Sequence, residues 1–191
     1  MRKLIVTENI TVDGVIDATG GWFTVAAGPE ESDQVEAVRA QFEAADAVLF
    51  GRVTFEEMRG YWPHATEDTT GVADYLNKVE KLVVSSSLVD PQWDNTTVLS
   101  GPLVEEIRAR KAAPGKDIVC TGSIRLVHAL LAAGLVDEFR LFMHPVVLGG
   151  GARLFPDGTP LSRLRWEEAT SFRSGVVLLR YGWIPAASAT A

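Results

Sequence analysis

The sequence predicts an α/β fold with a central, mostly parallel sheet and a C-terminal antiparallel hairpin. Short apolar runs alternate with helical patterns along most of the chain, which is typical of β-α-β units. Three of these runs, at 47–50, 81–85 and 117–121, end in or run into glycine or hydroxyl-bearing residues. Strand ends of this kind are expected where an open α/β sheet binds a ligand at its carboxyl edge.

Apolar periodicity defines the elements of the first half of the chain. The first strand ends at Asp13-Gly14, a dipeptide that favours a tight turn. The next segment repeats Val35, Val38 and Phe42 at helical spacing. The predicted strands are 4–12, 47–50 and 81–85, and the predicted helices are 31–44, 54–60 and 72–78.

The second half continues the alternation and then changes character. Pro114-Gly115 closes one helix, and Ile124, Val127 and Leu130 line one face of the next. Ser174-Gly175 forms the turn of a terminal hairpin. The predicted helices are 103–111 and 124–134, and the predicted strands are 98–99, 117–121, 138–145, 166–172 and 176–183.

The chain shows no internal repeat and no linker, so we expect one domain over residues 1–184. Residues 185–191 are small and polar enough to form a flexible tail. A net charge of −7 argues against nucleic acid or an anionic membrane as a partner. The single cysteine, Cys120, rules out an internal disulfide, and no apolar run approaches the roughly 20 residues of a membrane span. We therefore expect a cytoplasmic protein.

The stretch after the strand at 47–50 combines three groups suited to a phosphorylated ligand. Gly51 lets the backbone approach a ligand closely, and Arg52 offers a fork of donors for a phosphate. Thr54 and the free amides of the following helical turn can hold a pyrophosphate. A turn glycine and a helix-capping threonine would explain the same residues without any ligand.

Two later strand ends carry similar groups. Ser85 and Ser86 can bond an adenosine ribose or its 2′-phosphate, or can simply cap a turn. Gly122 and Ser123 open a helix at Ile124 whose amides can face an anion. This segment lacks the G-x-G-x-x-G pattern and a suitably spaced acidic residue, so it is not a Rossmann fingerprint.

In this order the segments resemble the dihydrofolate reductase superfamily. The residues that carry the likeness are GRVTFE at 51–56, KLVVSSSL at 81–88 and IVCTGS at 118–123. The chain is still more similar to the C-terminal reductase domain of the bifunctional deaminase-reductase of riboflavin biosynthesis and to its stand-alone bacterial relatives. That likeness rests on TVDGVI at 11–16, GLVDE at 134–138 and HPVVLGGGARLF at 144–155, and the whole resemblance spans residues 4–183.

The resemblance implies a dihydrofolate reductase-like three-layer sandwich with helices on both faces of the sheet. It also implies an NADPH-dependent reductase like 5-amino-6-(5-phosphoribosylamino)uracil reductase, with hydride transfer to a small heterocyclic or sugar-imine substrate. By the same resemblance Arg52 contacts the 2′-phosphate, and Thr54 the pyrophosphate. Ser85 and Ser86 hold the adenosine end, while Gly122, Ser123 and Ile124 line the pyrophosphate and the nicotinamide ribose.

Two departures narrow the function. Dihydrofolate reductases place a carboxylate on the first helix after a Trp and a Pro, whereas Trp22 is followed here by Phe23 and Thr24. A true dihydrofolate reductase is therefore disfavoured. One cysteine and three histidines without the deaminase spacing exclude the zinc deaminase, and we predict no metal site. The remaining alternative is a protein that keeps the fold and binds NADPH without significant catalysis.

The substrate side is less defined. Asp13 is the carboxylate nearest the expected nicotinamide position and is the candidate proton donor, although it also suits a turn with Gly14. Trp22 can stack on a flat heterocycle or anchor a loop. Gly149 and Gly150 permit a close approach of backbone to substrate. The apolar run at 141–148 and the hairpin behind it suggest a strand edge that a second copy covers, giving a homodimer.

Overall fold

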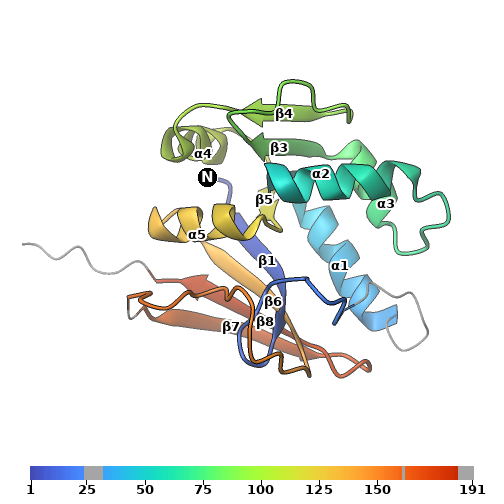
Figure 1. Ribbon diagram of the computed structural model, residues 1–191, viewed down its shortest axis with the longest axis vertical. Coiled ribbons are helices and arrows are strands. Elements are labelled where there is room, and N and C mark those ends of the chain that lie inside the picture. The colour runs from blue at the N-terminus through green and yellow to red at the C-terminus, as the bar shows by residue number, and fades with distance from the viewer. Residues whose placement is uncertain (24–31, 161, 185–191) are drawn as a thin grey trace, which may run out of the picture.

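The computed structural model describes residues 1–23, 32–160 and 162–184, and these form one eight-stranded mixed sheet in the order β4-β3-β2-β5-β1-β6-β8-β7 (Figure 1). The first six strands in this order run parallel, and β8 runs antiparallel to both of its neighbours, β6 and β7. The strands are β1 (Leu4–Thr11), β2 (Ala45–Gly51), β3 (Glu80–Val84), β4 (Thr96–Leu99), β5 (Asp117–Cys120), β6 (Glu138–His144), β7 (Leu164–Ser171) and β8 (Val177–Trp183).

Helices cover both faces of the sheet, as the sequence predicts for a dihydrofolate reductase-like three-layer fold (Figure 1). One face carries α1 (Ser32–Ala44), α2 (Arg52–Tyr61) and α3 (Val72–Lys78), with the short 3-10 helix η1 (Trp62–His64) after α2. The other face carries α4 (Leu103–Ala112) and α5 (Ile124–Ala132). The predicted fold class is therefore confirmed. The predicted tail at 185–191 lies outside the described residues.

The central strands are apolar on both sides because each side packs against helices. Successive residues alternate between two cores: Leu49 and Leu82 belong to the core under α4 and α5, whereas Phe50 and Val83 belong to the core with α2 and α3. This period-2 alternation fixes the register of each strand, because a slip of one residue would exchange the two cores. The same alternation decides which side chains of β1 and β5 face each of the two helical layers.

Two details differ from the sequence prediction. Helix α2 begins at Arg52 rather than at 54, because Gly51 ends β2 in extended conformation and directly precedes the helix. Thr54 thus lies inside the first turn. The strand that follows Asp137 is internal, since β6 pairs with β1 on one side and β8 on the other. Among the described residues the edge strands are β4 and β7. The segment at 141–148 is therefore not the edge at which the sequence places a second copy, and the homodimer stays a prediction.

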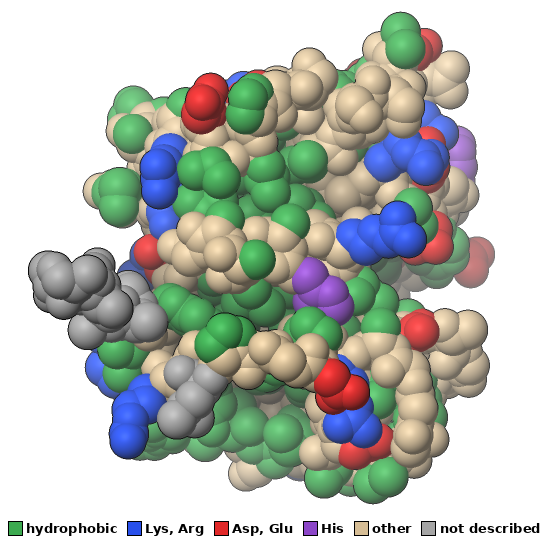
Figure 2. All heavy atoms as spheres, turned by 60° about the vertical axis from the view of Figure 1, so that its left-hand side comes forward, with side chains coloured by type: hydrophobic (Ala, Val, Ile, Leu, Met, Phe, Trp, Pro, Cys, Tyr) green, Lys and Arg blue, Asp and Glu red, His purple; other side chains and the backbone are tan. Residues whose placement is uncertain are grey.

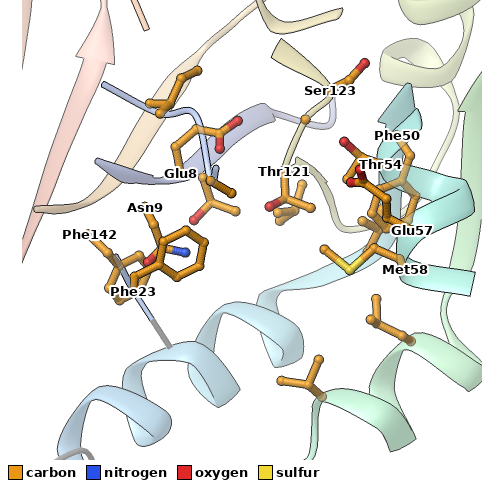
Figure 3. Close-up of a pocket in the computed structure, with 18 of the residues that line it drawn as sticks. Glu8, Asn9, Phe23, Phe50, Thr54, Glu57, Met58, Thr121, Ser123 and Phe142 are labelled. Atoms are coloured by element: carbon orange, nitrogen blue, oxygen red, sulfur yellow. The ribbon is translucent and has the colours of Figure 1, made fainter. Parts of the chain in front are cut away.

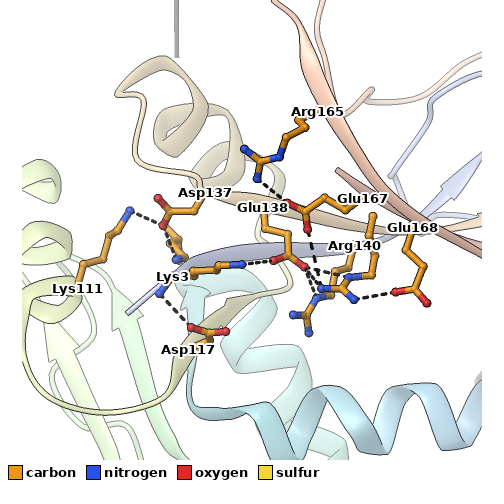
Figure 4. Close-up of polar contacts among 11 residues, drawn as sticks. Lys3, Lys111, Asp117, Asp137, Glu138, Arg140, Arg165, Glu167 and Glu168 are labelled. Carbon is orange, nitrogen blue, oxygen red and sulfur yellow. Dashed lines mark hydrogen bonds and ion pairs between the residues drawn. The ribbon is translucent and has the colours of Figure 1, made fainter. Parts of the chain in front are cut away.

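A buried ion-pair cluster fastens β8 to the parallel part of the sheet (Figure 4). One oxygen of Glu138 accepts bonds from Arg140 Nε at 2.8 Å and from Arg180 Nη2 at 3.0 Å, and the other accepts from Lys3 Nζ at 3.0 Å. Burial alone would raise the pKa of Glu138, but these cations outweigh it and lower the pKa to about 2. The carboxylate is therefore charged and saturated with donors.

On the side seen in Figure 2, positively and negatively charged side chains lie scattered between hydrophobic ones, and neither sign of charge forms a large patch. No helix of the described residues is both long enough and apolar enough to pass through a bilayer.

Candidate functional site

A cavity of about 890 Å³ opens at the carboxyl ends of β1, β2 and β5 (Figure 3). Its volume lies in the range of small-molecule binding sites. Its walls come from β1 and the loop after it, from α1, α2 and α3, and from the turn between β5 and α5. The polar and aromatic residues of these walls include Glu8, Asn9, Phe23, Gln41, Phe50, Thr54, Tyr75, Thr121, Ser123 and Arg125.

Two helix N-termini meet at one side of this cavity. The amide of Gly51 donates to the carbonyl of Gly122 at 3.0 Å, which ties the start of α2 to the segment before α5. Neither N-cap, Gly51 or Ser123, forms a side-chain hydrogen bond to the turn it precedes. The amides of both first turns are therefore not capped by these side chains, and their combined partial positive charge favours an anion.

Glycine is needed where these segments touch. A Cβ on Gly51 would overlap the Oγ atom of Ser123. Gly122 has φ +111°, and a Cβ there would lie 3.1 Å from Thr54 Oγ1. The peptide between Gly122 and Ser123 is cis. The backbone segments that begin α2 and α5 therefore lie in close contact.

The strand order places the predicted cofactor segments next to one another, since β3, β2 and β5 are neighbours. Thr54, Gly122, Ser123 and Ile124 line the cavity itself. Gly51 is buried directly behind Ser123.

The remaining cofactor candidates lie at the same edge but outside the cavity wall. Arg52 is exposed at the start of α2 and pairs with Glu56 at 2.8 Å. Ser85 Oγ accepts the amides of Ser87 and Leu88, so it caps a turn, which is the alternative that its position in the sequence also allowed. Ser86 is exposed just after the end of β3. The roles of these residues toward an adenosine phosphate stay predictions.

Asp13 serves the loop rather than the cavity. Its carboxylate accepts the hydroxyl of Thr11 at 2.6 Å and the amides of Gly149 at 2.8 Å and Leu148 at 3.3 Å. These bonds lower its pKa to about 2, the Thr11 bond most strongly. Asp13 does not line the cavity. An ionised carboxylate engaged by three donors is poorly suited to give up a proton at neutral pH, and the role of Asp13 as proton donor stays a prediction.

The other substrate candidates also hold the loops around β1. Trp22 Nε1 donates to the carbonyl of Asp17 at 2.7 Å, and its ring packs edge-on against His144 and Phe23. Phe23 lines the cavity, whereas Trp22 does not. Gly149 and Gly150 are exposed outside the cavity wall. Of this aromatic group, Phe23 is therefore the side chain that faces the cavity.

Glu8 is a residue of the site that sequence reasoning missed. It lies on β1 and lines the cavity (Figure 3), and its Oε1 is buried without a hydrogen-bond partner among the described residues. Burial raises its pKa to about 8. At neutral pH it is a protonated carboxyl facing the site. A glutamate within the predicted first strand was the available signal.

Comparison with known proteins identifies the family. The family model of the RibD C-terminal domain matches residues 2–178. The uncharacterized protein YyaP of Bacillus subtilis (strain 168) is 32% identical over 191 residues, covering 95% of each chain. The chain belongs to the RibD C-terminal domain family, a family of reductase domains, and is thereby placed among the oxidoreductases.

Solved structures agree on the fold. A putative riboflavin biosynthesis protein from Shewanella sp. PV-4 superposes with a TM-score of 0.75 at 21% identity, covering 95% of this chain and 99% of that chain. Dihydrofolate reductase from Enterococcus faecalis, complexed with NADP(H) and RAB-propyl, superposes with a TM-score of 0.61 at 18% identity, covering 94% of both. These likenesses establish a dihydrofolate reductase-like fold.

Proposed function

We propose that this chain is an NADPH-dependent reductase that transfers a hydride to a small heterocyclic or sugar-imine substrate. The observation that supports it most is the pair of helix N-termini, α2 and α5, joined by the Gly51–Gly122 hydrogen bond beside one cavity. Such a pair suits the two phosphates of a dinucleotide. The family relationship supports the same reaction class.

The residues at this edge fit a phosphorylated nicotinamide cofactor. Gly51 and Gly122 let the starts of α2 and α5 pack against each other, a contact that a Cβ at either glycine would disturb. This packing would hold the backbone amides of Thr54 and Ser123 side by side for a pyrophosphate. Ile124 would border the nicotinamide ribose. At the neighbouring strand end, Arg52 would bind the 2′-phosphate by exchanging its exposed partner Glu56, and Ser85 and Ser86 would flank the adenosine.

Glu8 is the residue that we propose as the proton donor of the reduction. Reduction of a C=N or C=O bond needs a hydride at carbon, which NADPH supplies as it becomes NADP⁺, and a proton at the heteroatom. Glu8 is protonated at neutral pH, and its Oε1 has no competing partner among the described residues. We assign the proton to Glu8, and to Asp13 the holding of the loop at Leu148 and Gly149.

The decisive experiment is a titration with NADPH and with NADH, followed by quenching of tryptophan fluorescence. Trp62 lines the cavity and reports on its occupancy. We expect micromolar binding of NADPH and at least tenfold weaker binding of NADH. Absence of binding for both cofactors would overturn the proposal.

The Arg52→Ala variant tests the 2′-phosphate assignment. It should weaken NADPH about tenfold or more and leave NADH unchanged, because only NADPH carries the extra phosphate. Arg108→Ala is the matched control, since Arg108 is an exposed arginine on α4, on the opposite face of the sheet. Equal losses for both cofactors in Arg52→Ala would remove this role from Arg52.

A further inference from the structure

All three buried side-chain oxygens that lack a hydrogen-bond partner within the described residues line the same cavity. They are Glu8 Oε1, Gln41 Oε1 and Tyr75 Oη. Buried polar atoms are almost always paired in native proteins, so three exceptions in one cavity indicate groups kept for a ligand. Gln41 on α1 is only 8% exposed, and burial raises the pKa of Tyr75 on α3, so the phenol is neutral.

Gln41 and Tyr75 stand in a part of the cavity that is otherwise apolar. We call it the α1–α3 lobe; besides these two residues it consists of Val38, Phe42, Met58, Trp62, Val72 and Leu76. The rings of Phe42 and Tyr75 stack in parallel, with centroids 4.0 Å apart and an interplanar angle of 8°. The stacked pair is rigid, and with the apolar side chains around it and two isolated hydrogen-bonding atoms the lobe favours a flat ligand with few polar groups.

The charge of the lobe opposes a phosphate. Residues 24–31, 161 and 185–191 contain no lysine or arginine, and among the described residues Arg125 is the sole lysine or arginine that lines the cavity. Arg125 lies in the first turn of α5, at the proposed cofactor side. The acidic residues Glu8, Asp17 and Glu57 also face the cavity. Among the described residues the lobe itself offers no cation to a phosphate, and the rest of the cavity wall carries carboxyl groups.

The helix N-termini near the lobe are also unsuited to an anion, because carboxylates of the chain already occupy them. Asp33, in the first turn of α1, accepts the amide of Gln34 at 3.0 Å. Asp68, just before α3, accepts the amides of Thr70 at 2.8 Å and Ala73 at 2.9 Å. The uncapped turns of α2 and α5 are at the cofactor side.

We propose that the α1–α3 lobe binds a neutral, planar heteroaromatic molecule without a phosphate, which offers an N–H or O–H donor to Gln41 Oε1. The proposal rests on the reductase function above, and it directs the search for a substrate away from ribose phosphates of the riboflavin type. Tyr75 Oη supplies a second hydrogen bond, and Phe42, Met58 and Val72 contact the faces of the ring.

The test uses quinoxalin-2(1H)-one, a neutral fused heterocycle that has a ring N–H and a C=N bond. Its binding is measured by calorimetry without NADPH, and the N1-methylated analogue and ribose 5-phosphate are measured beside it. We expect the N–H probe to bind about tenfold more tightly than the methylated one, the scale of one good hydrogen bond. Ribose 5-phosphate should neither bind nor compete.

Two variants locate the probe. Gln41→Leu should bind the two heterocycles equally, because the acceptor is gone, and Val38→Phe should abolish binding by filling the lobe. Val104→Phe is the matched control, since Val104 is a half-buried valine on α4 in the other layer. Thermal melts confirm that each variant folds.

The outcomes separate this proposal from the reductase function. Probe binding that Val38→Phe does not affect, no probe binding at all, or competition by ribose 5-phosphate would overturn the lobe proposal, whatever the NADPH titration shows. Probe binding with the expected variant pattern supports the lobe even if NADPH fails to bind, in which case the reductase proposal falls alone.

Discussion

Two glutamates on neighbouring strands have pKa values shifted in opposite directions. Glu8 on β1 and Glu138 on β6 both have buried carboxyl oxygens, and β1 pairs directly with β6. Glu138 is enclosed by the cations of Lys3, Arg140 and Arg180, and its pKa falls to about 2. Burial alone acts on Glu8, and its pKa rises to about 8.

The two pKa values differ because the two carboxyl groups have different hydrogen-bond partners. The Glu138 oxygens are saturated by the chain itself, so this carboxylate contributes to the stability of the sheet and has nothing left for a ligand. Glu8 carries into a cavity an oxygen that no described residue pairs, an arrangement that costs stability and is typical of functional sites. The number of hydrogen-bond donors, rather than burial, separates the charged carboxylate of Glu138 from the carboxyl of Glu8, which we propose as the proton donor.

The largest expected effect comes from removing the saturated carboxylate. Glu138→Ala leaves Arg140, which is 7% exposed, as a buried cation without its acceptor. We expect a loss of roughly 3–5 kcal/mol in the free energy of unfolding, measured by urea denaturation. Glu168→Ala is the control, because Glu168 pairs with Arg180 at the exposed rim and should cost less than about 1 kcal/mol. Similar losses in both variants would contradict the comparison.

Substitution of Glu8 should increase the free energy of unfolding, the opposite of the change expected at Glu138. Its folded pKa of about 8 lies above the ordinary value of 4.5, so between these pH values ionisation favours the unfolded chain. Glu8→Gln keeps the size, removes this penalty and should raise the free energy of unfolding by roughly 3 kcal/mol at pH 7. The gain should vanish below about pH 4.5, where both states are protonated. A gain that is the same at pH 4 and pH 7 would show that ionisation is not its cause.

Activity should follow the same ionisation. With Glu8 as proton donor, kcat/KM for a reducible substrate should decline about tenfold per pH unit above about pH 8, as the carboxyl loses its proton. Glu8→Gln should be slower and should lose this alkaline limb. A charge-conserving change at the other glutamate, Glu138→Asp, should leave the limb in place, because its network is separate from the cavity.

The smallest effect is expected at Asp13. Asp13→Asn loses one acceptor for the Gly149 and Leu148 amides but leaves the cavity wall intact. We expect kcat/KM within about threefold of the native value. A loss of a hundredfold or more would return the proton-donor role to Asp13, as the sequence alone suggests.

Much of the fold could be predicted from local patterns. The alternation of apolar runs with helical spacing, and the turn at Ser174-Gly175, define the strands and helices to within a few residues, because each pattern reflects which face is buried. The short strand ends at Gly51, Ser85 and Gly122 also suffice to predict one ligand edge, since neighbouring parallel strands carry their carboxyl ends to the same side.

The site depended on contacts between distant segments. Asp13 looks like a free acid in sequence, and only the fold brings Leu148 and Gly149 onto its carboxylate. Glu8 looks like an ordinary surface residue of a strand, and only the tertiary packing around the cavity buries it without a partner among the described residues. The sequence by itself determined the elements and the edge of the sheet at which the cavity lies, because these follow from periodicity and from the parallel strand order. Tertiary structure decided which carboxyls are charged, because a pKa depends on neighbours that the chain brings together only when folded.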